Sequence, residues 1–311
     1  MRPISTAALA LTLLASLPAS AAEQRLLIAP HDTDARLSGS EAPHLVVYDP
    51  EEADKPDQPL LIWLPGTHGK PASGPAPFFD TVRKQGYRLL GIAYKTELGV
   101  SNVCKGVQLQ MHKDCAEQFR QQRVWGDSES HVIDDKPEDA IVPRLVKLLQ
   151  HLAKTAPTGG WDQYLKDGEP RWERILLAGQ SQGGGMAGFL AQTRSVAGVL
   201  MFSGGWDQGR RGDIADWYRR PSKTPAERWF ATYHLDEPMG STMARIYRAL
   251  GVPPEHISAL KLPVQGANAH GEAIHNLAYR PLWLRALARQ TRPAEPAACA
   301  ASCPEAEPAR K

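Results

Sequence analysis

The stretch that decides the expected fold of this chain is Ile175-Leu176-Leu177-Ala178-Gly179-Gln180-Ser181-Gln182-Gly183-Gly184. A short apolar run leads directly into the pattern G-x-S-x-G, and further small residues follow at helical spacing. A chain that turns sharply from a buried strand into a helix holds such a serine in a strained conformation with its hydroxyl exposed. The two glycines of the pattern leave room for the turn, because a Cβ at either position would collide with neighbouring backbone. Ser181 is therefore the candidate nucleophile; a Gly/Ser-rich turn in another kind of α/β protein is the alternative.

Apolar strands and amphipathic helices alternate on both sides of this motif. Continuous apolar runs predict strands at residues 44–48, 60–64, 87–94, 174–178, 196–202 and 229–234. Helical spacing of apolar side chains predicts helices at residues 137–153, 238–250 and 279–289. The alternation predicts an α/β fold with a mostly parallel central sheet and helices on both faces. Long connections interrupt it, and we expect cap-like insertions at residues 96–136, 155–172 and 207–226.

The two ends of the chain differ in composition from its middle. Residues 1–22 combine Arg2, an apolar stretch and the small residues Ala19-Ser20-Ala21, which is typical of a signal peptide. We therefore expect a secreted or periplasmic protein without stable membrane insertion, because this apolar stretch is too short to span a bilayer comfortably. Residues 23–290 form one expected domain, and residues 291–311, rich in Pro and Ala, form an expected flexible tail.

The four cysteines fall into two close pairs, Cys104 with Cys115 and Cys299 with Cys303. In the oxidising compartment that the signal peptide indicates, each pair is expected to form a local disulfide. The first would close a loop inside an insertion, and the second lies in the expected tail.

The charge balance excludes two classes of partner. The 36 basic residues become 35 once Arg2 is removed with the signal, against 34 acidic residues, so the net charge is +1. Nothing in that balance indicates binding to nucleic acid or to an anionic membrane surface.

A serine hydroxyl needs a histidine within hydrogen-bond reach to take its proton. The loop Asn268-Ala269-His270-Gly271 follows the last expected strand, and its glycine eases the turn. We predict His270 as this base, with His275 as the competitor five residues on. The alternative for either is an ordinary surface histidine near the start of a helix.

The histidine in turn needs a carboxylate that fixes its tautomer. Asp236 follows the strand expected at 229–234 and precedes a helix, so we predict that it is the acid. Asp207, after the preceding strand, and Glu237 are the other candidates. The alternative for the aspartates is an ordinary loop or helix N-cap residue.

Two backbone N–H groups are expected to form an oxyanion hole. One belongs to Gln182, directly after the nucleophile, and the other to the loop after an earlier strand. Pro65-Gly66-Thr67-His68-Gly69 is that loop by position, and Thr67 is the predicted donor. His68 is either a contact to substrate or leaving group, or a solvated loop histidine.

A metal-dependent reaction is the other chemistry that this region suggests. His270-Gly271-Glu272 matches the H-x-E pattern of zinc deaminases, which also need C-x-x-C downstream. Cys299 and Cys303 are one residue too far apart for that pattern. We therefore expect no metal and no cofactor.

Taken together, these residues resemble the α/β-hydrolase superfamily. The resemblance is carried by the 65–69 loop, the 179–183 motif, Asp236 and His270, in the chain order nucleophile, acid, histidine. More narrowly, the chain resembles a secreted, poorly characterised group of serine hydrolases in that superfamily. The residues that carry this narrower likeness are Cys104, Cys115, Arg144-Leu145, Trp172 and Met201-Phe202-Ser203.

The resemblance implies that residues 23–290 are a catalytic domain that cleaves a carboxylic ester or related acyl bond through a Ser-His-Asp triad. The substrate would be a small-molecule or polymeric ester. A peptidase or amidase on the same scaffold, and a non-catalytic binding protein that retains the fold, are the alternatives. The sequence specifies neither the acyl chain length nor the oligomeric state.

Overall fold

The computed structural model describes residues 23–37, 42–52, 58–127, 129 and 132–290. The expected signal peptide, the expected tail and the Cys299–Cys303 pair lie outside these residues. Within the described ranges, no helix combines the length and the apolar character needed to cross a membrane.

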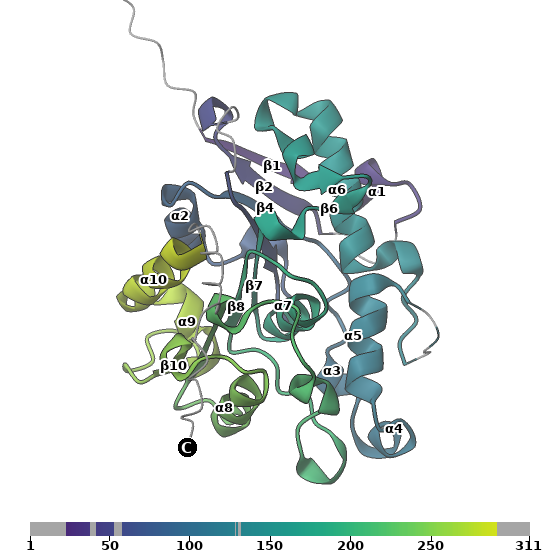
Figure 1. Cartoon of the computed structure of the whole chain (residues 1–311), viewed down its shortest axis with the longest axis vertical. Coiled ribbons are helices and arrows are strands. Elements are labelled where there is room, and N and C mark those ends of the chain that lie inside the picture. Colours follow the sequence, from purple (N-terminus) through teal and green to yellow (C-terminus); the bar gives the residue numbers. More distant parts are fainter. Residues whose placement is uncertain (1–22, 38–41, 53–57, 128, 130–131, 291–311) are drawn as a thin grey trace, which may run out of the picture.

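A single eight-stranded sheet runs through the centre of the described chain (Figure 1). Its strand order is β1-β2-β4-β3-β7-β8-β9-β10. Only β2 pairs antiparallel, with β1 and with β4, and all the remaining pairs are parallel. The strands are β1 (Gln24–Ile28), β2 (His44–Tyr48), β3 (Leu60–Leu64), β4 (Arg88–Gly91), β7 (Ile175–Gln180), β8 (Gly198–Phe202), β9 (Trp229–His234) and β10 (Ile257–Leu260). A separate short hairpin consists of β5 (Leu165–Lys166) and β6 (Glu169–Pro170).

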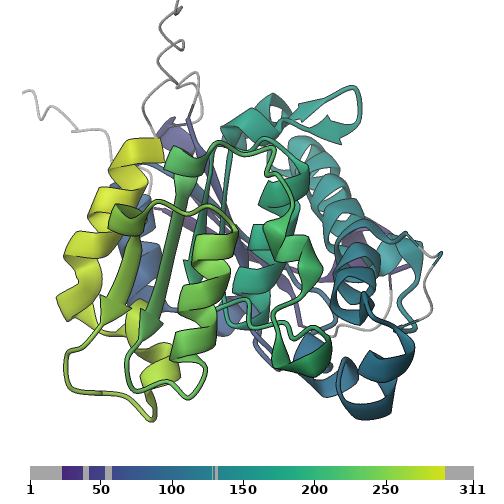
Figure 2. The ribbon, with the colours of Figure 1, turned by 60° about the horizontal axis from the view of Figure 1, so that its bottom comes forward.

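Helices cover both faces of this sheet, as Figures 1 and 2 show. The predicted α/β architecture, a mostly parallel sheet between two helical layers, is confirmed. The helices are α1 (Pro30–Thr33), α2 (Ala76–Lys84), α3 (Val100–Val103), α4 (Gly106–Met111), α5 (Cys115–Trp125), α6 (Ile141–Thr155), α7 (Gln182–Thr193), α8 (Gly240–Ala249), α9 (Glu272–His275) and α10 (Arg280–Gln290).

The alternation of side chains along each strand divides the core into two apolar layers. In β3, Leu61 and Trp63 pack with side chains of α2, α9 and α10. Leu60 and Ile62 point to the other face, where α5, α6, α7 and α8 lie. Because both faces of β3 are covered, its five residues are all apolar and all buried.

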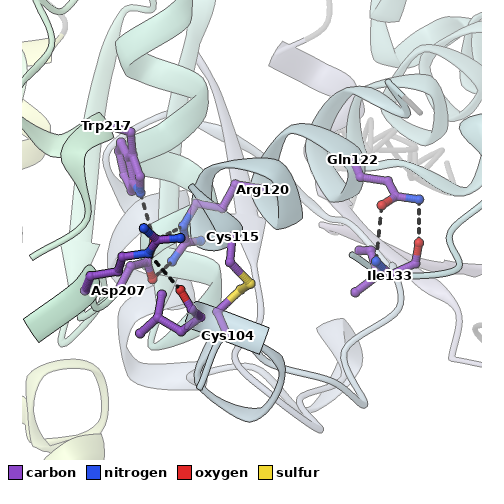
Figure 3. Close-up of a disulfide and its surroundings, with 9 residues drawn as sticks. Cys104, Cys115, Arg120, Gln122, Ile133, Asp207 and Trp217 are labelled. Atoms are coloured by element: carbon purple, nitrogen blue, oxygen red, sulfur yellow. Dashed lines mark hydrogen bonds and ion pairs between the residues drawn. A yellow bond between two sulfur atoms is a disulfide. The ribbon is translucent and has the colours of Figure 1, made fainter. Parts of the chain in front are cut away.

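The insertions differ in their position relative to Ser181. Residues 96–136 carry α3, α4 and α5, and the predicted Cys104–Cys115 disulfide is present there, with the two Cα atoms 5.6 Å apart (Figure 3). The 155–172 stretch packs at the amino ends of β3 and β4 instead. There the Tyr164 hydroxyl accepts a hydrogen bond from Arg88 and donates one to the backbone oxygen of Gln58. Since Ser181 follows the carboxyl end of β7, the expectation that this stretch caps the site is wrong.

Candidate active site

Ser181 lies at the sharp turn between β7 and α7, with φ of 58° and ψ of −124°. A non-glycine residue in this region of backbone space is strained, as expected for a serine presented at the tip of such a turn. A Cβ built on Gly179 would lie 2.4 Å from the backbone carbon of Gly183, and one on Gly183 would lie 2.0 Å from the Leu64 oxygen. The two glycines thus let β7, α7 and the end of β3 approach closely enough to hold the turn.

His270 pairs with a carboxylate, and that carboxylate belongs to Glu237. The ring nitrogen Nδ1 of His270 lies 2.7 Å from Glu237 Oε2. The other oxygen of Glu237 accepts hydrogen bonds from the Ser203 hydroxyl at 2.6 Å and from the backbone N–H of His234 at 2.7 Å. The Glu237 side chain is only 3% exposed, whereas that of His270 is 32% exposed. A buried carboxylate therefore holds one ring nitrogen of an imidazole that is itself partly exposed.

The hydrogen bonds around Glu237 keep it ionised. Burial by itself raises the pKa of this carboxyl. The hydrogen bonds from His270, the His234 backbone and Ser203, together with the charge of His270, outweigh burial and lower the pKa below its usual value. Glu237 can thus stabilise the positive charge that His270 gains when it takes a proton.

The prediction that Asp236 pairs with His270 is wrong. The Asp236 side chain is 70% exposed, and its carboxylate lies 3.6 Å from Nδ1 of His234 rather than near His270. After β9 the chain makes a turn in which the Glu237 N–H bonds to the His234 oxygen. This turn directs residue 236 to solvent and residue 237 inward.

Asp207 does not reach His270 either. Its two carboxylate oxygens each accept a hydrogen bond of 2.6 Å from Arg120, and Trp217 Nε1 donates a third at 3.0 Å. Both charged side chains are 2% exposed, so the pair is fully buried (Figure 3).

The loop that carries His270 is tied to the strand that carries the nucleophile. His270 lies in the 3₁₀ turn Ala269–Gly271, and its backbone N–H bonds to Asn268 Oδ1. Gln180 Nε2, one residue before Ser181, donates to the His270 backbone oxygen at 3.2 Å. The Trp206 ring packs against the imidazole at 5.2 Å between centroids. The competitor His275 ends α9 and is exposed.

Thr67 and Gln182, the predicted oxyanion donors, line one pocket together with Ser181. Their side chains also converge, because a Cβ built on Gly99 would lie 2.7 Å from Gln182 Oε1 and 2.9 Å from Thr67 Oγ1. Gln182 is the first residue of α7, so its backbone N–H belongs to the positive end of that helix. His68 lines a different pocket, which it shares with Gln180 and His275.

Ser203 is a site residue that the sequence analysis missed. It follows β8, is buried and has φ of 45°. Among the described residues, the other non-glycine positions with positive φ are His68, Asp167 and Ser181. Asp167 lies in the turn between β5 and β6, whereas the other three lie on the loops after β3, β7 and β8. The Ser203-Gly204-Gly205 run at the end of a strand was the available signal. Within the residues that the structure describes, no group of three or more His, Cys, Asp or Glu side chains is arranged to hold a metal ion.

The chain was compared with known proteins by sequence and by structure. No protein-family model and no curated protein matches the sequence. An α/β hydrolase enzyme from a Medee basin deep-sea metagenome library is similar in structure, with a TM-score of 0.49 at 12% identity, over 87% of this chain and 99% of that one. An esterase from Pyrobaculum calidifontis is similar with a TM-score of 0.47 at 11% identity, over 87% and 85% of the two chains. Thermogutta terrifontis esterase 2 gives 0.44 at 11% identity, over 85% and 91%. At these levels the likeness says nothing about the chemistry of this chain.

Proposed function

We propose that this chain is a secreted serine hydrolase of the α/β-hydrolase superfamily, with residues 23–290 as its catalytic domain, and that it cleaves a carboxylic ester. The proposed triad is Ser181, His270 and Glu237. The observation that carries the proposal is the 2.7 Å bond between the His270 ring and a buried carboxylate, in a loop that Gln180 ties to the strained serine turn. A histidine oriented by a buried carboxylate is the arrangement that activates a serine hydroxyl.

In the proposed reaction, the Ser181 Oγ attacks the ester carbonyl while His270 Nε2 takes its proton. Glu237 keeps the other proton of the ring on Nδ1 and stabilises the imidazolium. The backbone N–H groups of Gln182 and Thr67 hold the negative oxygen of the tetrahedral intermediate. His270 then protonates the departing alcohol, and a water activated by the same histidine releases the acid and regenerates Ser181.

Secretion of the protein is part of the proposal. It is supported by the composition of residues 1–22 and by the Cys104–Cys115 disulfide, since disulfides persist in oxidising compartments. Expression of the full chain in a bacterium, followed by fractionation and N-terminal sequencing, tests this. A protein that stays in the cytoplasm with residues 1–22 intact would contradict it.

A fluorophosphonate probe tests the nucleophile directly. We expect one covalent label on Ser181, lost in Ser181→Ala and slowed at least about a hundredfold in His270→Ala. A folded wild-type protein that takes no label would favour a non-catalytic binding protein. Hydrolysis of a 4-nitrophenyl ester against the matching 4-nitroanilide then separates an esterase from an amidase or peptidase.

A further inference from the structure

A small pocket opens beside Ser181, and several of its lining residues are polar. Thr67, Ser101, Arg120, Gln182 and Trp206 are among the residues that line it with the serine. Two of the insertions supply part of this lining, since Ser101 and Arg120 belong to the 96–136 stretch and Asp207 belongs to the 207–226 stretch. The insertions therefore contribute to the wall of this pocket, and such connecting segments are where substrate specificity is commonly set.

Arg120, one of the lining residues, carries a buried side-chain nitrogen without a partner among the described residues. Its Nε and Nη2 donate to Asp207, and its guanidinium lies 5.6 Å from the centroid of the Trp217 ring (Figure 3). The third nitrogen, Nη1, is buried and has no hydrogen-bond partner among the described residues. A buried donor without an acceptor costs free energy, so the presence of this unpaired N–H group in the folded protein needs an explanation.

The chain is locally shaped to hold the guanidinium there. A Cβ built on Gly185, in the first turn of α7, would lie 2.2 Å from Arg120 Nη2 and 2.7 Å from Nη1. Glycine at this position therefore makes space for the charged group directly behind the nucleophile. The Gln182 side chain, which also lines the pocket, is buried and lies close to the Tyr94 hydroxyl.

We propose that this pocket receives the acyl part of the substrate, and that Arg120 Nη1 donates a hydrogen bond to a neutral oxygen on that acyl group, a carbonyl or a hydroxyl. The inference rests on the proposed ester hydrolysis at Ser181. A neutral oxygen is favoured over a carboxylate because Asp207 already balances the charge of Arg120 and would repel a second anion.

The assignment to the acyl part rests on the proposed oxyanion donors. Thr67 and Gln182, the proposed oxyanion donors, line the polar pocket. Gln180 and His275 line a separate cavity, and Gln180 also bonds to the loop of His270, which must protonate the leaving alcohol. Because Trp206 of the polar pocket also packs against the imidazole, both cavities border the histidine loop. The acyl part is placed in the pocket with Arg120 because the oxyanion donors, which hold the acyl carbonyl oxygen, line that pocket.

Two 4-nitrophenyl esters that differ by one oxygen test the proposal on the purified protein. They are the pentanoate and the 4-oxopentanoate, the second of which carries a ketone oxygen in a chain of the same length. We expect kcat/KM for the 4-oxopentanoate to exceed that for the pentanoate about tenfold, a typical effect of a hydrogen bond to a charged donor. The hemisuccinate, which ends in a carboxylate, is expected to be a poorer substrate than the 4-oxopentanoate.

The variant Arg120→Lys keeps a cation next to Asp207 but removes Nη1. Its ratio of kcat/KM between the two esters should fall to below about twofold, a measure that is independent of the fraction of active enzyme. Arg123→Lys is the matched control, because Arg123 is buried on the same helix α5 but pairs with Asp135 outside the pocket, and its ratio should stay at the wild-type value.

The outcomes are distinguishable. Equal kcat/KM for both esters in the wild type would overturn the inference, and this readout needs no variant. A clear preference for the hemisuccinate would overturn the neutral oxygen, and a preference seen only with an oxygen in the alcohol part would overturn the acyl assignment. Failure of the fluorophosphonate to label Ser181, with no hydrolysis of any ester, would instead refute the proposed function on which the inference rests.

Discussion

Replacing Glu237 by Gln removes one negative charge from the proposed triad while keeping the shape of the side chain. The structure determines which way the new amide must face. Two donors, the Ser203 hydroxyl and the His234 N–H, point at Oε1, and one partner, His270 Nδ1, faces Oε2. The single oxygen of Gln is best placed against the two donors, so its NH₂ group faces the imidazole.

This orientation forces His270 into the wrong tautomer. With an NH₂ group as its neighbour, Nδ1 must accept a hydrogen bond, so the ring proton moves to Nε2 and the ring can no longer take the proton of Ser181. We expect kcat/KM to fall about 10³–10⁴-fold. Because two of the three hydrogen bonds are kept and the third is reversed, the free energy of unfolding should fall by only about 1–2 kcal/mol.

The assay is hydrolysis of a 4-nitrophenyl ester, with urea unfolding of the same preparations. The matched control is Asp236→Asn, one residue earlier and 70% exposed, for which we expect kcat/KM within about twofold of the wild type. Near-normal turnover by Glu237→Gln, or a large loss in Asp236→Asn alone, would refute the assignment of the acid.

Three further measurements test the structure. Burial, with the nearby charges of Arg144 and His151, lowers the pKa of His44 from 6.5 to about 3. Its contribution to stability is therefore complete above pH 6.5 and declines by about 1.4 kcal/mol per pH unit as the pH falls toward 3; urea unfolding of His44→Gln should show a weaker pH dependence, and an identical one would contradict this. In urea unfolding, the free energy of unfolding of Ser181→Gly should exceed that of Ser181→Ala by about 1 kcal/mol, because glycine adopts the positive φ of this position without strain; equal free energies would argue against strain. Cys104→Ser should lower the free energy of unfolding by about 2–3 kcal/mol, since the disulfide closes a short loop; a reduced wild-type sample with unchanged stability would show that the bond contributes nothing.

Part of the candidate site could be predicted from the sequence, and part of it could not. The G-x-S-x-G motif identified Ser181, and the position after the last strand identified His270, because both depend on local chain order. The choice between Asp236 and Glu237 depends on how the chain turns after β9, since adjacent residues in a tight turn point in different directions. Neither apolar spacing nor residue type distinguishes them.

The sequence alone determined the layered α/β architecture, because the alternation of apolar strands and amphipathic helices reflects which faces each element must bury. It also determined the turn at Ser181, where two glycines at fixed spacing are a local steric requirement. Only the tertiary structure decided that Glu237 and Ser203 join His270, and that Arg120 and Asp207, separated by 87 positions, meet beside the serine. Such contacts between distant segments depend on the packing of the insertions onto the sheet, and no pattern within a single segment encodes that packing.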